Sequence, residues 1–264
     1  MPSIPLACTV RACGRPLDSG AGVLQCSGGH SFDRARIGYV NLLQPQDSKS
    51  KHPGDSIEAV AARRRLHDRG VTRALLDGIA SIAQAEVSDI VLDAGCGEGF
   101  YLGEIAARTG CKGHGIDISI PAVDAASRRY PRCERGCEWV VANADRFVPY
   151  ADESFSLAMS ITARMNAPEF HRVLRKGGRL LVAVAAPEDL IELRGKGRER
   201  ADRTIADFSQ GFRVLEQQRV TTSAELDAAG TEDVLLAIYR PLRPEPAGAR
   251  RITLSLDLIL FQKR

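Results

Sequence analysis

Three glycines and two acidic residues near position 95 have the types and spacing needed to hold a nucleoside. Gly95, Gly97 and Gly99 directly follow an apolar run that contains Asp93, and they precede a helical pattern. Because glycine has no Cβ atom, a turn built from it can lie flat against a ligand. Asp117 ends the next apolar run, where a carboxylate can accept hydrogen bonds from both hydroxyl groups of a ribose. This arrangement predicts a nucleoside-containing cofactor on the glycine loop.

The charge of the surrounding residues separates two classes of cofactor. A dinucleotide needs bare backbone amides at the helix start to bind its pyrophosphate, whereas S-adenosylmethionine has no phosphate and carries positive charge. Glu98 occupies the helix start in this chain, which favours S-adenosylmethionine. Asn143 and Asp145 follow a third apolar run, where an amide or carboxylate can bond the exocyclic amine of adenine. The predicted S-adenosylmethionine site consists of Asp93, Gly95, Gly97, Gly99, Tyr101, Asp117 and Asn143.

Four residues near the N-terminus have the spacing of a zinc site. Four residues separate Cys8 from Cys13, three separate Cys26 from His30, and twelve lie between the two pairs. Two such short ligand pairs can bring four donors to one tetrahedral zinc ion. Four protein ligands leave no position for water, so the predicted zinc is structural and would staple a segment with few apolar residues. The alternative is that Cys8 and Cys13 are small buried residues and that His30 lies on the surface.

The elements that position these residues follow from the hydrophobic pattern. From residue 89 onward, apolar runs alternate with amphipathic segments, which is typical of a parallel sheet with helices on both faces. Strands are expected at residues 89–94, 112–118, 138–142, 155–160 and 179–186. Helices are expected at residues 98–108, 121–130 and 166–175, and the last of them turns into a strand through Lys176, Gly177 and Gly178.

Beyond residue 212 the pattern changes to strand candidates with no clear helices between them, at residues 213–222, 233–242 and 251–264. In the last segment apolar and polar residues alternate from 252 to 257, which predicts one drier and one wetter face. A sheet of about seven strands that ends in an antiparallel pair fits this pattern. The predicted fold class is α/β, with a zinc-binding module at 1–45, a linker and helices that break at Gly70 at 46–80, and a cofactor-binding domain at 81–264.

Charge is unevenly distributed along the chain. Residues 1–75 hold 11 Lys and Arg against 6 Asp and Glu, whereas the remainder holds 25 against 27. A basic first quarter fits a polyanionic partner, and it equally fits a solvated surface. No apolar run has the length of a signal peptide or a membrane span, and the seven cysteines are an odd number. We therefore expect a cytoplasmic protein without disulfides and without a membrane partner.

With these motifs in place, the chain resembles the RlmA/TlrB-type 23S rRNA (guanine-N1)-methyltransferases from Cys8 to about residue 195. The resemblance rests on the zinc-ligand pattern, the run GHSFDRARIGYVNLL (29–43), the segment PGDSIEAVAARRRLHDRG (53–70) and the cofactor loop. It implies a class I, Rossmann-like, seven-stranded methyltransferase fold with a small N-terminal zinc-ribbon-like module. It further implies that the module recognises 23S rRNA and that residues 81–264 form a methyltransferase domain that modifies a guanine, at N1, in a hairpin loop. The candidate phosphate contacts are Arg34, Arg36, Lys49, Lys51, Arg63, Arg64 and Arg65.

Three departures from the family pattern leave other functions open. Thr72 stands where the family commonly has a tyrosine, Arg164 where it has a proline, and Asp189 where it often has a histidine. One alternative is a methyltransferase for a small molecule or peptide. The other is a zinc-ribbon RNA-binding protein whose methyltransferase domain is inactive. The sequence identifies no catalytic base, and it leaves open whether the chain forms a homodimer.

Overall fold

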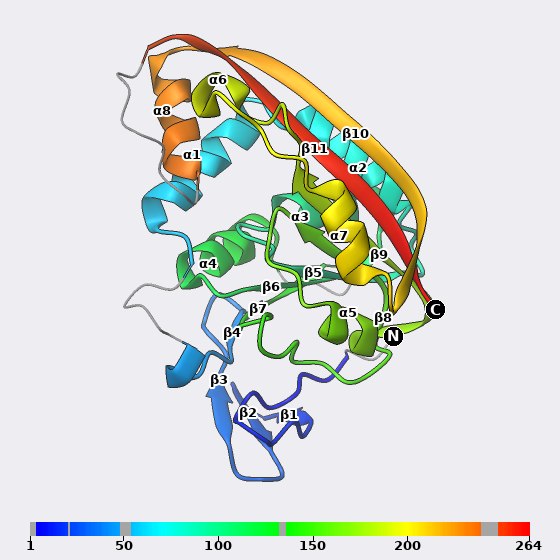
Figure 1. Cartoon of the computed structure of the whole chain (residues 1–264). Helices are drawn as coiled ribbons and strands as arrows, with labels where there is room; N and C mark the ends of the chain where they lie inside the picture. The colour runs from blue at the N-terminus through cyan, green and yellow to red at the C-terminus, as the bar shows by residue number, and fades with distance from the viewer. Residues whose placement is uncertain (1–3, 21, 48–53, 132–135, 239–247) are drawn as a thin grey trace.

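The fold is built around one sheet of eight strands in the order β10-β11-β9-β8-β5-β6-β7-β4 (Figure 1). The computed structural model describes residues 4–20, 22–47, 54–131, 136–238 and 248–264. Five parallel strands form the centre of the sheet: β9 (Leu174–Ala185), β8 (Phe155–Ile161), β5 (Ile90–Ala94), β6 (Lys112–Asp117) and β7 (Cys137–Val141). β11 (Arg250–Lys263) is antiparallel to β9, and β10 (Phe212–Leu226) is antiparallel to β11. These seven strands confirm the predicted α/β sheet with its antiparallel pair.

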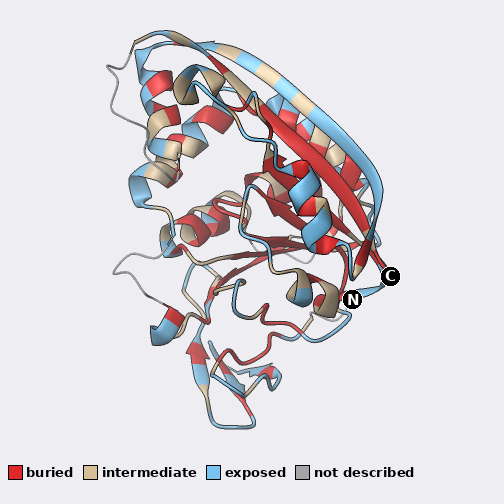
Figure 2. Cartoon of the chain, in the orientation of Figure 1, coloured by how far each residue is buried: buried red, intermediate tan, exposed pale blue. Residues whose placement is uncertain are grey.

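Helices cover both faces of this sheet, so its central strands are buried (Figure 2). One face packs against α2 (Arg73–Ala83), α3 (Phe100–Thr109) and α4 (Ile120–Arg129). The other face packs against α5 (Ala167–Val173), α7 (Ala201–Phe208) and the N-terminal residues. A smaller apolar cluster joins α1 (Ile57–Asp68), α6 (Ile191–Arg194) and α8 (Ala228–Ala237) to the far ends of β10 and β11. No helix in the described ranges has the length and hydrophobicity needed to cross a lipid bilayer.

The expected helical segment after the linker is present and breaks where glycine permits it. Ser56 caps α1, because its hydroxyl oxygen accepts a hydrogen bond from the Ala59 N–H at 3.2 Å. Gly70 separates α1 from α2 and has φ of +76°, a left-handed conformation that other residues rarely adopt. As a result α2 is free to turn its apolar side, which includes Leu76 and Ile79, onto the sheet.

The N-terminal residues form a small antiparallel sheet and then join the large one. The small sheet contains β1 (Leu17–Ser19), β2 (Val23–Cys26) and β3 (Ser31–Asp33). The short strand β4 (Val40–Asn41) then runs parallel to β7 and becomes the eighth strand. The Leu42 N–H extends this pairing by donating to the Val141 carbonyl at 2.8 Å, and the Ala7 N–H donates to the Pro149 carbonyl at 2.9 Å. Apolar residues of the module therefore share one core with the sheet.

An ion pair fixes the end of the module. The 3-10 helix η1 (Pro45–Asp47) carries Asp47, whose carboxylate accepts two hydrogen bonds from the Arg146 guanidinium at 2.6 and 3.0 Å. The same guanidinium donates to the Thr9 carbonyl at 3.0 Å. Arg146 therefore ties both ends of the module to the loop that follows β7.

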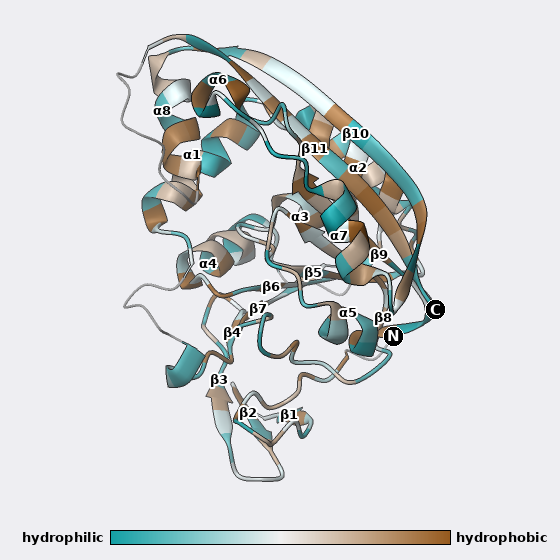
Figure 3. Ribbon diagram, viewed as in Figure 1, coloured by the Kyte–Doolittle hydropathy of each residue, from teal (hydrophilic) through white to brown (hydrophobic). Residues whose placement is uncertain are grey.

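Two predictions for the C-terminal part were wrong. The predicted strand at 233–242 is helical through α8, which begins where the Asp227 carboxylate accepts a hydrogen bond from the Gly230 N–H at 2.7 Å; residues 239–242 lie outside the described ranges. The predicted wetter face of the last strand is also largely buried, because Ser255 and Asp257 are buried and only Thr253 is partly exposed. Asp257, 1% exposed, is compensated by a fork of hydrogen bonds from Arg219. Figure 3 shows the mainly hydrophobic β11 beside β10, along which hydrophilic and hydrophobic residues are mixed.

Candidate functional site

The predicted cofactor residues gather at one edge of the sheet. Asp93, Asp117 and Asn143 lie at or just beyond the carboxyl ends of β5, β6 and β7, which are neighbours in the sheet. Ala94 is in register with Ile116, and the Ala142 N–H donates to the Asp117 carbonyl at 3.0 Å. The carboxyl edge of a parallel sheet, where adjacent strands connect to helices on opposite faces, is where such folds bind ligands.

The glycines of the loop are required by their surroundings. Gly95 has φ of +87°, and a Cβ atom there would lie 2.3 Å from the Ala163 Cβ. Gly99 has φ of +77°, and a Cβ atom there would lie 2.4 Å from the ring of Trp139. Both distances are far below van der Waals contact, so any side chain would force the loop away from the strand ends.

Backbone amides and burial set the electrostatics of the two acids. The Asp117 carboxylate accepts hydrogen bonds from the Gly97 N–H at 2.9 Å and the Ser119 N–H at 2.8 Å. Burial raises the pKa of Asp117, and these two amides partly offset the shift. The loop is therefore bonded directly to the acid that is predicted to hold the ribose.

Asp93 is a buried acid near the end of β5. It is 2% exposed, and its Oδ1 accepts no hydrogen bond from any residue that the structure describes. Burial, reinforced by the negative charges of Asp117 and Glu98, raises the pKa of Asp93 to about 8. An uncompensated buried carboxyl group is costly unless a cation neutralises it. The ammonium and sulfonium groups of S-adenosylmethionine supply that charge, so these residues fit the cofactor.

A group of ionised and polar side chains locks α1 onto the glycine loop. Glu98, 3% exposed, accepts hydrogen bonds from Arg63 Nη1 at 3.1 Å and from His67 Nε2 at 2.8 Å. Arg63 Nη2 also donates to Asp55 Oδ2 at 2.7 Å. We call Asp55, Arg63, His67 and Glu98 the loop clamp. From the sequence Glu98 indicates only a site unsuited to pyrophosphate, although the four-residue spacing of Arg63 and His67 places both on one face of a helix.

The loop clamp also closes the segment before α1 over the end of β6. The Ser119 hydroxyl donates to the Asp55 carbonyl at 2.8 Å. Gly54 approaches the same residue so closely that an added Cβ would lie 2.7 Å from the Ser119 Cβ. Asp117 therefore lies between the glycine loop on one side and the 54–56 segment on the other.

The remaining predicted residues stand around this edge. Tyr101, on the first turn of α3, has its ring edge-on to His67 and to Phe100, with centroids 5.8 and 5.3 Å away. Asn143 Oδ1 accepts a hydrogen bond from the Asp145 N–H at 3.1 Å, which shapes the turn after β7. No described contact assigns either residue to a cofactor, and both stay predictions.

Two of the three positions that depart from the family pattern are used within the fold. Thr72 is buried and hydrogen-bonded through its hydroxyl to His67 Nδ1. Asp189 is buried, accepts from the Ser255 N–H at 3.2 Å and pairs with Arg194 at 3.3 Å. Arg164, in contrast, is 80% exposed and lies 3.5 Å from the Asp145 carboxylate. Only Arg164 therefore presents an altered side chain to an approaching substrate.

Most of the predicted phosphate contacts are occupied by protein carboxylates. Arg63 belongs to the loop clamp, Arg65 forms a fork on Asp233, and Arg34 pairs with Glu138 at 3.4 Å. Of the other four candidates, Arg64 pairs with Asp68 at 3.7 Å, Arg36 is exposed, and Lys49 and Lys51 lie outside the described residues. Whether an arginine is free to bind phosphate therefore depends on the carboxylates that lie next to it in the folded chain, and the sequence alone does not show these.

The predicted zinc ligands converge on one point. The ligand atoms of Cys8, Cys13, Cys26 and His30 all lie within 4.8 Å of one another. Two sulfurs are 3.8 Å apart, and His30 Nδ1 lies 3.4 and 3.5 Å from the sulfurs of Cys8 and Cys26. A tetrahedral zinc ion imposes about 3.8 Å between two sulfurs and about 3.5 Å between a sulfur and a nitrogen. The four residues therefore fit a structural zinc ion, and the alternative of unrelated buried thiols is wrong.

Backbone groups also prepare the site for a cation. Burial acts to raise the pKa of the Cys26 thiol, but amides of His30 and Gly28 and the neighbouring thiols lower it to about 6. A thiolate is the form that binds zinc. The turn between β2 and β3, which closes with the Cys26 N–H donating to the His30 carbonyl at 3.0 Å, thus supplies one ready ligand pair.

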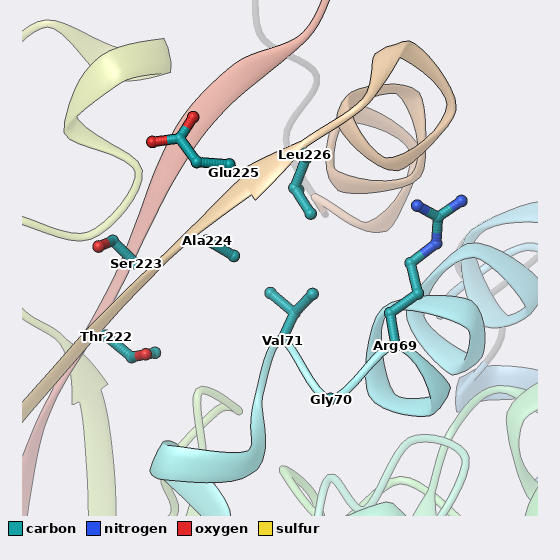
Figure 4. Close-up of a pocket in the computed structure, with 8 residues that line it drawn as sticks. All are labelled: Arg69, Gly70, Val71, Thr222, Ser223, Ala224, Glu225 and Leu226. Carbon is teal, nitrogen blue, oxygen red and sulfur yellow. The ribbon is translucent and has the colours of Figure 1, made fainter.

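Two hollows adjoin Gly70, and neither is lined by a predicted cofactor residue. The first, of about 290 Å³, lies between the α1–α2 junction and the end of β10. In Figure 4, Val71, Ala224 and Leu226 face one another across it, whereas Glu225 points to the other side of β10. It presents no convergent set of ionisable groups, and we assign it no ligand.

Comparisons with known proteins agree with this geometry. The family model for the RlmA N-terminal zinc ribbon matches residues 7–51, and the model of a methyltransferase domain matches residues 91–182. Among solved structures, the methyltransferase of Haloferax volcanii in complex with its Trm112 activator has a TM-score of 0.54 at 20% identity, covering 79% of this chain and 98% of that one. A methyltransferase of Bacillus halodurans has a TM-score of 0.51 at 18% identity, covering 71% and 97%. These structures establish the methyltransferase fold.

Two relatives establish more than the fold. The 23S rRNA (guanine(748)-N(1))-methyltransferase of Streptomyces fradiae is 34% identical over 226 residues, which cover 81% of this chain and 78% of the relative. A protein of Micromonospora griseorubida named for 23S rRNA guanine-N1 methylation is 35% identical over 209 residues, covering 71% and 68%. The protein is therefore an S-adenosylmethionine-dependent methyltransferase with a structural zinc site, and it belongs to the RlmA-type 23S rRNA (guanine-N1)-methyltransferase family.

Proposed function

We propose that the protein transfers the methyl group of S-adenosylmethionine to N1 of a guanine in a hairpin loop of 23S rRNA. The observation that carries this proposal is the union, in one chain and one core, of the zinc module and the methyltransferase sheet. The two relatives described above match most of this chain, and their names give guanine N1 of 23S rRNA as the position methylated. We propose that residues 1–45 recognise the RNA. Residues 46–80 connect this module to the methyltransferase domain and hold the glycine loop, and residues 81–264 bind the cofactor and catalyse methyl transfer.

Each predicted cofactor residue has a proposed task. Asp93 offsets the positive charge of the cofactor, and Gly95, Gly97 and Gly99 let the backbone approach it. Asp117 accepts the ribose hydroxyls; its oxygens already bond two amides, but each carboxylate oxygen has two acceptor positions. Asn143 bonds the adenine amine, and Tyr101 contributes an aromatic wall.

Methyl transfer to guanine N1 requires few catalytic groups from the protein. When bound, S-adenosylmethionine supplies an electrophilic methyl group, and N1 of guanine attacks it in line with the departing sulfur. Because N1 carries a proton at neutral pH, that proton must leave before or during transfer. A guanine in a loop can be turned out of the stack so that its edge reaches the methyl group. The protein thus contributes proximity, orientation and a proton acceptor.

Asp145, which follows β7, and Arg164, which follows β8, form an exposed ion pair at the carboxyl edge of the sheet. Burial raises the pKa of Asp145, while Arg164, 3.5 Å away, acts in the opposite direction. Asp145 remains exposed, so a substrate can reach it. We propose Asp145 as the first residue to substitute in a search for the proton acceptor.

A small-molecule or peptide substrate has less support. That alternative depended on altered positions in the pocket, but Thr72 and Asp189 are bonded within the protein. Only Arg164 remains as an altered exposed residue, and a cation suits RNA at least as well as a small molecule.

The test is methylation of an unmodified 23S rRNA transcript with radiolabelled S-adenosylmethionine, followed by primer extension. N1-methylguanine blocks base pairing, so a discrete stop at one guanine supports the proposal. Asp117→Ala should abolish the stop, whereas Asp124→Ala, which removes only a surface ion pair with Arg128, should preserve it. Cofactor binding without label in any RNA would instead direct the search to small molecules and peptides.

A further inference from the structure

The sheet order separates the cofactor side of the site from the side on which a substrate must approach. The predicted cofactor residues follow β5, β6 and β7, whereas β8 and β9 lie on the other side of β5. A substrate that meets a methyl group near the end of β5 has its free approach over the ends of β8 and β9. The segments that follow these two strands are therefore the ones in a position to touch it.

The segment between α6 and α7 follows β9 and is strongly basic. We call residues 195–200 the basic loop; it contains Lys196, Arg198 and Arg200, all exposed. None of these three side chains forms an ion pair with a residue in the described part of the chain. The single acid of the loop, Glu199, turns toward Arg219 of β10, whose Nη2 lies 3.0 Å from it. Lys196 and Arg198 therefore lie exposed without a paired carboxylate in the described part of the chain, whereas Arg200 also acts electrostatically on Asp189.

Contacts with β10 and with Pro187 restrain the backbone of this loop. Arg219 bonds Glu199 at 3.0 Å and Glu188 at 3.3 Å, so one guanidinium fastens both ends of the segment 188–199. Asp257 holds the same guanidinium from β11 at 2.7 Å. Gly197 lies against Pro187 so closely that a Cβ atom would be 1.7 Å from the Pro187 carbonyl oxygen. Because these contacts restrain the backbone of the loop before a ligand arrives, less backbone freedom is lost when its cations bind.

Three cations of α1 and the N-terminal module contrast with this loop. Protein carboxylates form ion pairs with Arg34, Arg63 and Arg65. At the end of β8, Arg164 is 80% exposed and its carboxylate neighbour Asp145 is 3.5 Å away. Exposed cations without tight partners bind the phosphates of a nucleic acid, which positions the strand without reading its sequence.

We propose that the basic loop binds the phosphate backbone of the RNA strand that carries the target guanine, with Lys196, Arg198 and Arg200 as the contacts and Arg219 as the residue that positions them. This proposal rests on the proposed rRNA substrate and adds a second contact surface to the zinc module. The two surfaces lie on different sides of the cofactor edge, because β4 joins β7 at one end of the sheet and the loop follows β9. The RNA would thus be held on both sides of the methyl group.

The experiment compares RNA binding by the full-length zinc-loaded protein and by Lys196→Ala/Arg198→Ala/Arg200→Ala. The probe is a 23S rRNA hairpin transcript, titrated at several KCl concentrations, with S-adenosylmethionine affinity measured in parallel. Loss of three phosphate contacts should weaken RNA binding by roughly tenfold or more near physiological salt and reduce the slope of log K against log salt by about 2. The dissociation constant for S-adenosylmethionine should stay within about twofold, because the loop touches no predicted cofactor residue.

Two controls separate this effect from a general loss of charge. Arg175→Ala/Lys176→Ala removes exposed cations at the start of β9, at the opposite end of the strand from the basic loop. This variant should retain the RNA affinity and the salt slope. Lys196→Arg/Arg198→Lys/Arg200→Lys keeps the charges and should bind like the unaltered protein, whereas Arg219→Ala should weaken RNA binding with all three cations present.

The outcomes are distinct from those of the methylation assay. If the loop variant retains full RNA affinity and salt slope, or if the Arg175/Lys176 variant weakens binding equally, the basic loop is not the contact surface. If the unaltered protein binds RNA through the loop but leaves no primer-extension stop, the loop proposal stands and the proposed methylation target fails. Absence of any RNA binding by the unaltered protein overturns both proposals.

Discussion

Arg63 on α1 lies 3.1 Å from Glu98 in the glycine loop, although 35 residues separate them in the sequence. The Arg63 side chain is 26% exposed and Glu98 only 4%, so the pair lies at the inner edge of the interface between helix and loop. Charge pairs of this kind cost much when one partner is removed, because the other is left buried and uncompensated. The helix that follows the linker is therefore held directly against the glycine loop.

Arg63→Ala should weaken cofactor binding by releasing the glycine loop and the 54–56 segment together. We expect the dissociation constant for S-adenosylmethionine, measured by calorimetry, to rise about tenfold or more. The free energy of unfolding should fall by roughly 1–3 kcal/mol, with His67 still bonded to Glu98. Arg63→Lys should recover part of the affinity, since it restores the charge without the fork.

Arg64 provides the matched control for Arg63. It is the next residue on the helix, is 51% exposed and pairs only loosely with Asp68 at 3.7 Å. Arg64→Ala should leave cofactor affinity unchanged and change stability by less than about 0.5 kcal/mol. Equal effects of the two substitutions would show that net charge rather than the loop clamp controls cofactor affinity.

Protonation of Asp93 should make the stability of the cofactor-free protein depend on pH. The pKa of Asp93 is raised from 3.8 to about 8 by burial, so the folded state retains a proton that the unfolded chain releases. Between about pH 4 and pH 8 the unfolded state binds fewer protons, and the free energy of unfolding therefore falls as pH rises. Thermal denaturation across this range measures the slope, and Asp93→Asn should make it shallower.

The same group predicts proton release on cofactor binding. A cation favours the ionised carboxylate, so S-adenosylmethionine should bind more tightly as pH rises toward 8 and should expel a proton below that pH. Calorimetry in buffers of different ionisation enthalpy counts this proton. A pH-independent affinity with no proton release would mean that Asp93 does not face the charged part of the cofactor.

Removal of zinc should unfold the module and loosen the edge of the sheet. We expect about one zinc ion per chain by elemental analysis, and loss of it in Cys26→Ser. Cys111→Ala is the control, because Cys111 is fully buried and outside the ligand group, so its variant should keep the metal. Full zinc content in Cys26→Ser would refute the assignment of Cys26 as a ligand.

Asp189 should act on stability and not on cofactor affinity. Its carboxylate holds the Ser255 amide and Arg194, so Asp189→Ala leaves a buried N–H and a guanidinium without partners. The free energy of unfolding should decrease by roughly 1–3 kcal/mol in urea titration. An affinity for S-adenosylmethionine that falls tenfold in this variant would instead place Asp189 in the pocket.

Local patterns made part of this molecule predictable from sequence. The cofactor loop depends on glycines and strand ends that are adjacent in the chain, and the zinc site depends on two short ligand pairs; both patterns survive folding unchanged. The helix α8 was misread because its apolar run is short, and periodicity alone does not distinguish a short buried helix from a strand. The partners of Arg63, Arg65 and Arg146 come from distant segments, so no local pattern reveals them.

The two-residue strand β4 has a further consequence for the behaviour of the protein in concentrated solution. By pairing with β7, it covers backbone groups that would otherwise form an open sheet edge beside the buried residues Val140 and Val141. Open edges of this kind recruit other chains and lead to aggregation. Chelation of zinc should unfold the module that contains β4 and therefore make the protein prone to self-association through β7. The metal then maintains solubility as well as the fold of the module.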